Sequence, residues 1–174
     1  MRAESAGDGV DAGAVIDGIY RYHLYRAWPS ASLLDMNGSV LWIMLNPSTA
    51  TDTQLDPTLR RCLGYTQAWG FSRMDICNLF AYRSTSPEAM LDAAKSGIDI
   101  VGPRNDEYII HQAAEADLVM CGWGKDGNYA GRAKHVMDLI RDWTKLHALN
   151  TNIDGSPCHP LYLRSDLKPK PYGG

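Results

Sequence analysis

Residues 40–47 read Val-Leu-Trp-Ile-Met-Leu-Asn-Pro, six apolar residues followed at once by an Asn-Pro pair. A continuous apolar run of this length is typical of a strand that is covered on both faces of a sheet. Pro47 keeps Asn46 out of helical geometry and fixes where the chain leaves the strand. The run therefore predicts a central strand whose carboxyl end is a place to look for a functional site.

Strands and helices are predicted to alternate along the rest of the chain. Apolar runs and helix-cap signals predict a strand over 19–28, a helix from Asp56, a strand over 74–80, helices from Ser86 and Pro103, a strand over 118–123, a helix over 129–143 and a strand over 146–149. This order predicts the α/β class, as a three-layer α/β/α sandwich around a mostly parallel central sheet. Residues 1–15 are expected to be a flexible N-terminal tail and residues 16–174 a single α/β domain.

The composition excludes several classes of protein. With 45% hydrophobic residues and a net charge of −3, the chain suits a globular core better than a generally basic nucleic-acid coat. No cysteine belongs to a C-x-x-C pair, so neither a metal nor another cofactor is expected, and Cys77 and Cys121 are predicted to be buried small hydrophobes. No stretch approaches the ~20 apolar residues of a membrane span, and the N-terminus lacks the apolar core of a signal peptide. A cytoplasmic protein is expected.

Three polar residues stand where predicted strands end or loops follow them. Asn46 ends the first apolar run, Asn78 interrupts the strand over 74–80, and His159 lies in a rigid segment between prolines. Ligands of open α/β sheets bind at the carboxyl ends of the strands. We therefore expect Asn46, Asn78 and His159 to line one cleft at that edge.

The chemistry of these side chains suits a polar ligand. An amide offers both a donor and an acceptor to a water or to the edge of a nucleobase, and a histidine can donate to a developing anion. Plainer interpretations stay open: Asn46 as a turn residue that bonds its own backbone, Asn78 as a structural amide that bonds a neighbouring loop, and His159 as an ordinary loop residue. Arg83 can pair with a phosphate or with a surface carboxylate.

The segments around these residues resemble motifs of the uracil-DNA glycosylase superfamily. Residues 45–48, Leu-Asn-Pro-Ser, resemble the Gly-Ile-Asn-Pro-Gly motif of the mismatch-specific branch; residues 76–83 resemble the strand motif of the thermophile-type branch; and His159-Pro160 resembles the start of the His-Pro-Ser motif. The resemblance implies a uracil-DNA glycosylase-like fold. It also implies roles: Asn46 positions the hydrolytic water, Asn78 reads the base, and His159 stabilises the departing base anion.

The chain from about Tyr20 also resembles a family of bacteria and phages whose function is unknown. The matching hallmarks lie at residues 45–50, 56–61, 78–80, 123–124 and 159–163. The sequence departs from the glycosylase motifs in one respect that bears on the base, because Thr58 stands where an aromatic residue would stack on it. Tyr65, Phe80 or Trp123 could take that place.

The function expected is that of an N-glycosidic hydrolase acting on a base in DNA or in a related nucleotide. The alternatives are a non-catalytic module that binds a base or nucleotide, and an unrelated hydrolase or transferase on a similar sheet. The candidate catalytic residues are Asn46, His159 and Asp52, with Asp56 as a second possible base that is also a predicted helix cap. The candidate residues for binding a base or nucleotide are Asn78, Ser48, Phe80, Arg83, Arg60 and Trp123.

Overall fold

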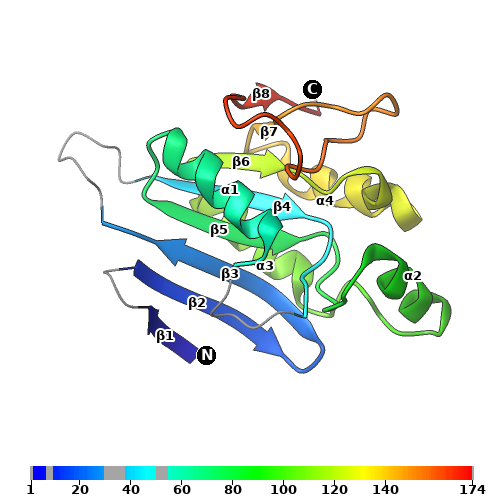
Figure 1. Ribbon diagram of the computed structural model, residues 1–174. Coiled ribbons are helices and arrows are strands. Elements are labelled where there is room, and N and C mark those ends of the chain that lie inside the picture. The colour runs from blue at the N-terminus through cyan, green and yellow to red at the C-terminus, as the bar shows by residue number, and fades with distance from the viewer. Residues whose placement is uncertain (1, 7–9, 30–37, 50–54, 174) are drawn as a thin grey trace.

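The computed structural model in Figure 1 describes residues 2–6, 10–29, 38–49 and 55–173. An eight-stranded sheet runs through these residues in the order β1-β2-β3-β5-β4-β6-β7-β8. The strands are β1 (Arg2–Ala6), β2 (Val10–Asp17), β3 (Tyr20–Ala27), β4 (Ser39–Met44), β5 (Arg73–Asn78), β6 (Leu118–Cys121), β7 (Leu146–Ala148) and β8 (Lys170–Pro171). The helices are α1 (Pro57–Ala68), α2 (Pro87–Lys95), α3 (Asn105–Glu115), the 3₁₀ segment η1 (Lys125–Gly131) and α4 (Arg132–Ile140).

Parallel pairing is confined to the middle of the sheet. β4 pairs in parallel with β5 and with β6, and β6 pairs in parallel with β7. The pairs β1·β2, β2·β3, β3·β5 and β7·β8 are antiparallel. The α/β class is confirmed, but the sheet is mixed rather than mostly parallel. The sequence pattern shows where strands lie, whereas their direction depends on connections such as the tight turn at Gly18, whose φ of +57° suits glycine.

Helices cover both faces of the sheet, as Figure 1 shows. Along β4, Val40 and Trp42 join the hydrophobic cluster beneath α1, whereas Leu41 and Ile43 join the cluster beneath α2, α3 and α4. Successive side chains of a strand point to opposite faces, so a strand between two helical layers must be apolar throughout. The apolar run of residues 40–45 is therefore explained by the three-layer arrangement.

Residues 10–15 belong to a strand, where the sequence predicted a flexible tail. β2 pairs with β3 from Asp11 opposite Ala27 to Asp17 opposite Tyr20. Small residues and acidic residues conceal this strand, because they lack the large apolar side chains that mark a strand in a sequence. Gly13 has a packing role, since a Cβ atom there would lie 2.6 Å from the Tyr25 ring.

The helix caps form as predicted. The backbone N–H of Leu59 donates to Oδ1 of Asp56 at 2.8 Å, and that of Ala89 donates to Oγ of Ser86 at 3.1 Å. These bonds satisfy donors that the first turn of a helix leaves without partners. Among the described residues, no helix has the length and apolar character needed to cross a membrane.

The predicted core cysteines are buried. Cys77 and Cys121 are 0% and 1% exposed, and all four cysteines of the chain are free thiols. Burial raises the pKa of both side chains well above the ordinary value of a thiol, so neither forms a thiolate at neutral pH. They pack as small hydrophobic residues and are unsuited to nucleophilic chemistry.

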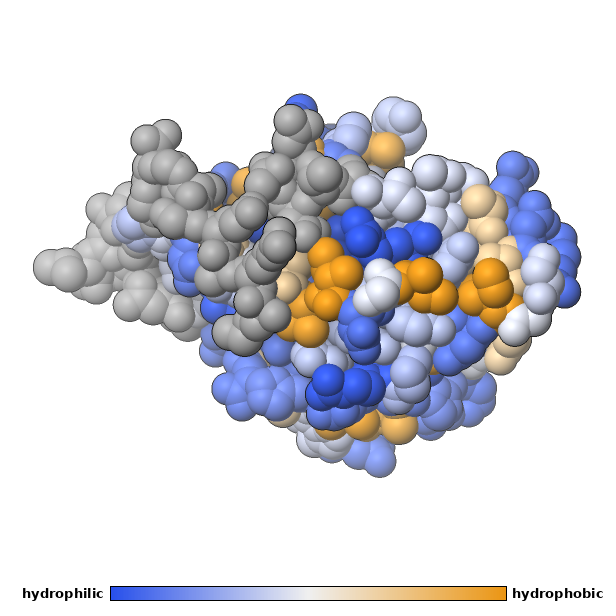
Figure 2. Space-filling view, turned by 90° about the horizontal axis from the view of Figure 1, so that it is seen from below, coloured by the Kyte–Doolittle hydropathy of each residue, from blue (hydrophilic) through white to orange (hydrophobic). Residues whose placement is uncertain are grey.

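Apolar side chains are also present on the outer surface. In Figure 2, a narrow band of hydrophobic residues crosses a face that is otherwise mostly hydrophilic. Ile16 in β2 and Ile19 in the turn to β3 are 37% and 50% exposed. Exposed apolar side chains in such numbers are common on protein surfaces, so they indicate no binding site on their own.

Candidate functional site

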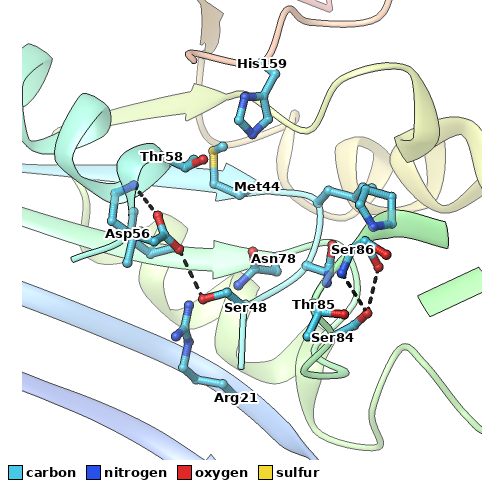
Figure 3. Close-up of a pocket in the computed structure, with 15 residues that line it drawn as sticks. Arg21, Met44, Ser48, Asp56, Thr58, Asn78, Ser84, Thr85, Ser86 and His159 are labelled. Carbon is cyan, nitrogen blue, oxygen red and sulfur yellow. Dashed lines mark hydrogen bonds between the residues drawn. The ribbon is translucent and has the colours of Figure 1, made fainter. Parts of the chain in front are cut away.

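A cavity of about 210 Å³ lies where β4 and β5 end (Figure 3). Its lining comes from the ends of these two strands, from β3, from the segments that cap α1 and α2, and from the proline-rich segment near the C-terminus. Asn46, Asn78 and His159 all line this cavity. The prediction that the three side chains share one cleft at the carboxyl edge of the sheet is therefore confirmed.

Backbone hydrogen bonds hold the two asparagine-bearing segments together. Beyond the end of the strands, the N–H of Leu79 donates to the carbonyl of Met44 at 2.8 Å. Further along, the N–H of Ser84 donates to the carbonyl of Pro47 at 3.0 Å. The pairing of β4 with β5 thus extends into the loops, which fixes the spacing between Asn46 and Asn78.

The segment that carries His159 is tied to the same edge of the sheet. The N–H of Gly124, just after β6, donates to the carbonyl of Pro157 at 3.1 Å, and the N–H of Cys158 donates to the carbonyl of Asn150 at 2.8 Å. These bonds bring a residue from far along the chain to the cavity formed by β4 and β5. Residues 150–173 follow β7 as a long connection that contains the short strand β8, and His159 is the residue of this connection that lines the cavity.

Asn46 combines the two interpretations that the sequence left open. Its Nδ2 donates to the carbonyl of Pro47 at 3.2 Å, which is a local contact of the turn-forming kind. No donor among the described residues reaches its Oδ1, and the residue lines the cavity. The amide is therefore held by one end and offers an acceptor at the other.

Asn78 is almost fully enclosed, with only 2% of its surface exposed. Its side chain makes no hydrogen bond to any described residue, and it lies at the cavity (Figure 3). Among the described residues, no loop accepts or donates a hydrogen bond to this side chain, so the structural interpretation of Asn78 is not supported there. Because its amide faces the cavity and is not engaged by a described side chain or carbonyl, it is available to bond a ligand there.

His159 is half-buried, and its imidazole points into the cavity (Figure 3). Burial lowers the pKa of His159 from its ordinary value of 6.5, and the nearby charge of Asp56 opposes that shift only in part. Nδ1 accepts a hydrogen bond from the backbone N–H of Leu161 at 3.2 Å. The ring is therefore neutral at neutral pH, with its proton on Nε2.

Asp56 both caps α1 and lines the cavity. Its Oδ1 takes the cap bond from Leu59, while its Oδ2 accepts a hydrogen bond from Oγ of Ser48 at 3.1 Å. The predicted cap is thus confirmed, and the same carboxylate lies at the cavity. Ser48, a predicted binding residue, also lines the cavity.

Sequence reasoning missed Arg21 as a residue of the site. It lies in β3, is 4% exposed and contributes to the cavity lining. Figure 3 shows its side chain beside Ser48. A long cationic side chain in a strand that is otherwise largely buried is the signal that could have identified it, because buried charges are rare without a specific role.

The predicted aromatic residues do not line the cavity. Phe80 and Trp123 are 1% and 2% exposed and belong to the core beneath α2, α3 and α4. Their rings lie near other rings of the protein, with centroid distances of 6.2 Å from Phe80 to Tyr129 and 6.0 Å from Trp123 to Tyr172. Tyr65 lies on the buried face of α1, where its ring packs against those of Trp42 and Trp69 rather than at the cavity. Their sequence positions gave no information about which face each ring would take.

Two further candidates, Arg60 and Arg83, lie outside the cavity lining. Arg60 is exposed on α1. Arg83 donates from Nη2 to the carbonyl of Thr49 at 3.5 Å and is not among the lining residues. Asp52, the predicted general base, lies outside the described residues.

Within the described ranges, no group of three or more His, Cys, Asp and Glu side chains could hold a metal ion.

Comparison with known protein families gives a match over most of the chain. A family model described as "Protein of unknown function (DUF1643)" matches residues 21–161. The matched segment contains all but the first residue of β3, the central strands β4, β5 and β6, and all three of Asn46, Asn78 and His159. No curated protein and no solved structure matches the chain.

Proposed function

Because the chain belongs to the DUF1643 family, whose function is unknown, we propose its function from the cavity itself: an N-glycosidic hydrolase that recognises a base in DNA or in a related nucleotide. The observation that carries the proposal is the meeting of Asn46, Asn78 and His159 at one cavity. Its volume of about 210 Å³ is smaller than the ~300–1,000 Å³ of pockets for drug-sized ligands, which favours a ligand part as small as one base.

In the proposed reaction, a water oxygen forms a bond to the sugar carbon as the N-glycosidic bond breaks. The electron pair of that bond leaves with the nucleobase. The proton released by the water then neutralises the nucleobase anion. Asn46 orients the water through its free Oδ1. The carboxylate of Asp56 faces the positive charge that develops on the sugar. Asp52 keeps its proposed role as a general base that accepts the proton of the water.

The base is held by the other two residues. Asn78 pairs its amide with the base edge, which supplies the partner that this buried side chain lacks. His159 donates from Nε2 to the oxygen on which negative charge builds up. A neutral imidazole suits this task, because it can donate a hydrogen bond at neutral pH without an added charge.

The likeness to the uracil-DNA glycosylase superfamily belongs to this proposal. It is supported by the parallel strands β5, β4, β6 and β7 at the centre of the sheet, by helices on both of its faces and by the order of the three motif residues along the chain. A substrate of this class is found in the cytoplasm, which is the location we propose.

A non-catalytic module that binds a base or nucleotide is the second candidate. No Phe, Tyr or Trp side chain among the described residues lines the cavity, so the large ring that usually stacks on a base is missing from this lining. The amide of Asn46 is also partly engaged with Pro47. The second observation favours binding over turnover, because Asn46 is the residue proposed to position the water.

A substrate screen separates the two candidates. Single-stranded and duplex oligonucleotides that carry uracil, mismatched thymine or modified pyrimidines are assayed for base release and for binding, beside the free nucleosides. A hydrolase releases a base in the wild type and loses that activity in Asn46→Ala. Binding without release in any condition identifies the module. Neither binding nor release across the panel contradicts both candidates and leaves an unrelated enzyme on a similar sheet.

A further inference from the structure

Two buried carbonyl groups lie at the end of β5, where the pairing of β5 with its neighbour β3 is interrupted. The antiparallel pairing of β5 with β3 ends with Leu24 opposite Ile76. Asn78 and Leu79 follow, and they are 2% and 0% exposed. Buried backbone carbonyls are nearly always hydrogen-bonded, so their donors must come from elsewhere.

Side chains at the start of two helices supply these donors. Nδ2 of Asn105, a residue with 0% exposure, donates to the carbonyl of Asn78 at 2.9 Å and to that of Leu79 at 3.0 Å. Nε of Arg132, which is 6% exposed, donates to the carbonyl of Leu79 at 2.7 Å. Asn105 begins α3 and Arg132 begins α4, so both helices are joined to the main chain that carries Asn78.

A carboxylate on the outer side holds Arg132 in place. Nη2 of Arg132 lies 2.6 Å from Oδ1 of Asp106, and Nε2 of His135 lies 2.9 Å from Oδ2 of the same carboxylate. Burial alone would raise the pKa of Asp106, but its contacts with Arg132 and His135 outweigh burial and hold the pKa below its usual range. The carboxylate is therefore ionised and balances the charge of a guanidinium that has little access to solvent.

We propose that Asn105 and Arg132 are positioning residues that aim the amide of Asn78 into the cavity by holding the carbonyls of Asn78 and Leu79. The inference rests on the proposed function of Asn78 as the residue that binds the base edge. The side chain of Asn78 makes no hydrogen bond to a described residue, so the position of its main chain decides where the amide can reach in the cavity. Hydrogen bonding to a base requires the amide to be placed within about 0.5 Å of its productive position.

The test compares Asn105→Ala with Ile109→Ala. Ile109 lies one turn further along α3 and is also 0% exposed, but its side chain donates no hydrogen bond to β5. Both variants lose buried contacts from the same helix face, so a merely structural role for Asn105 predicts similar behaviour. A positioning role predicts effects on Asn78 in Asn105→Ala alone.

The first measurement needs no ligand. The side-chain NH₂ resonances of Asn78 are assigned in ¹⁵N-labelled protein by their absence from Asn78→Ala. We expect them to shift or broaden in Asn105→Ala and to stay in place in Ile109→Ala. Unchanged Asn78 resonances in Asn105→Ala would overturn the proposal.

The second measurement is the affinity for free uracil and deoxyuridine. We expect the Kd to rise about tenfold more in Asn105→Ala than in Ile109→Ala, because a misaligned amide loses its hydrogen bonds to the base. Equal changes in the two variants contradict the positioning role and leave the proposed function standing. If the wild type binds neither probe while the Asn78 resonances still respond to Asn105→Ala, the proposed function fails and the positioning role stands.

A milder variant covers the case in which Asn105→Ala does not fold. The side chain of Asp106 is 40% exposed, so Asp106→Asn releases Arg132 without opening the core. We expect the Asn78 resonances to respond to this change as well, and Lys134→Ala, on the exposed surface of α4, serves as its control. If Asn105→Ala does not fold and the Asn78 resonances are unchanged in Asp106→Asn, the proposal is overturned.

Discussion

The backbone N–H of Leu161 donates a hydrogen bond to Nδ1 of His159 at 3.2 Å. Because a backbone N–H can only donate, the neutral imidazole must carry its proton on Nε2. Pro160 stands between the two residues and limits the conformations open to this segment. The local chain thus determines the tautomer of His159 and presents a donor to the cavity.

The pH dependence of folding is expected to report on His159. Its folded pKa lies below the ordinary value of 6.5, so the folded protein binds this proton less readily than the unfolded chain does. The stabilising contribution is therefore complete above pH 6.5 and is lost as the pH falls from there through the lower folded pKa. We expect urea unfolding of the wild type to show a loss of stability over this range that is absent from His159→Gln. Parallel curves for the two proteins would contradict the prediction.

Two substitutions of Asp56 should separate its cap from its charge. Asparagine is as good a cap as aspartate, so Asp56→Asn should leave stability nearly unchanged, whereas Asp56→Ala should cost about 1 kcal/mol. Both variants remove the charge that raises the pKa of His159, so an NMR titration should show a lower His159 pKa in each. Ser86→Ala removes the cap of α2 without removing a charge and is the control. An unchanged His159 pKa in Asp56→Asn would show that the two side chains do not interact.

The elements that could be predicted from the sequence are those whose local signals agree with the fold. The Asp56-Pro57 pair begins α1, and the apolar run of residues 40–45 marks the strand between the two helical layers. The shared cavity of Asn46, Asn78 and His159 could also be predicted, because it follows from a general rule about the carboxyl ends of parallel strands.

The parts that could not be predicted depend on contacts between distant segments. β2 is stabilised by its pairing with β3, and nothing in its small residues requires a strand. Phe80 is close in sequence to Asn78, but its ring joins the core while the Asn78 side chain reaches the cavity. The support of Asn78 by Asn105 and Arg132 needs two helix starts to meet the end of β5, which no local pattern indicates.

An ionic cluster around the buried carboxylate of Asp75, on β3 and β5, should make the free energy of unfolding fall at low pH. Oδ1 of Asp75 lies 2.7 Å from Nε2 of His23, and both carboxylate oxygens accept hydrogen bonds from Arg73 at 2.8 Å. Burial would raise the pKa of Asp75, but these bonds outweigh it and lower the pKa from 3.8. The contribution of Asp75 is thus present above pH 3.8 and is lost as the pH falls through the lower folded pKa.

Asp75→Ala should accordingly be strongly destabilising. Removal of the carboxylate leaves the buried side chain of His23 without its partner, and the loss of one partner of a buried pair typically costs about 3–5 kcal/mol. Urea unfolding at neutral pH measures the change, and Asp92→Ala, which breaks an exposed ion pair with Lys95, is the control with an expected change of about 0–1 kcal/mol. Similar losses in the two variants would show that the buried cluster contributes little.

The two asparagines of the cavity should have separable effects on the proposed reaction. Asn46 acts on the water, so Asn46→Ala should reduce kcat strongly while leaving the affinity for the base or nucleotide nearly intact. Asn78 binds the base edge in the ground state as well, so Asn78→Ala should weaken binding by about 1–3 kcal/mol and reduce the preference among bases. Steady-state kinetics and calorimetric binding measure both effects, with Asn128→Ala in the exposed segment after β6 as the control. Loss of affinity in Asn46→Ala with unchanged kcat would reverse the assigned roles, because it would place the Asn46 amide on the ligand rather than on the water.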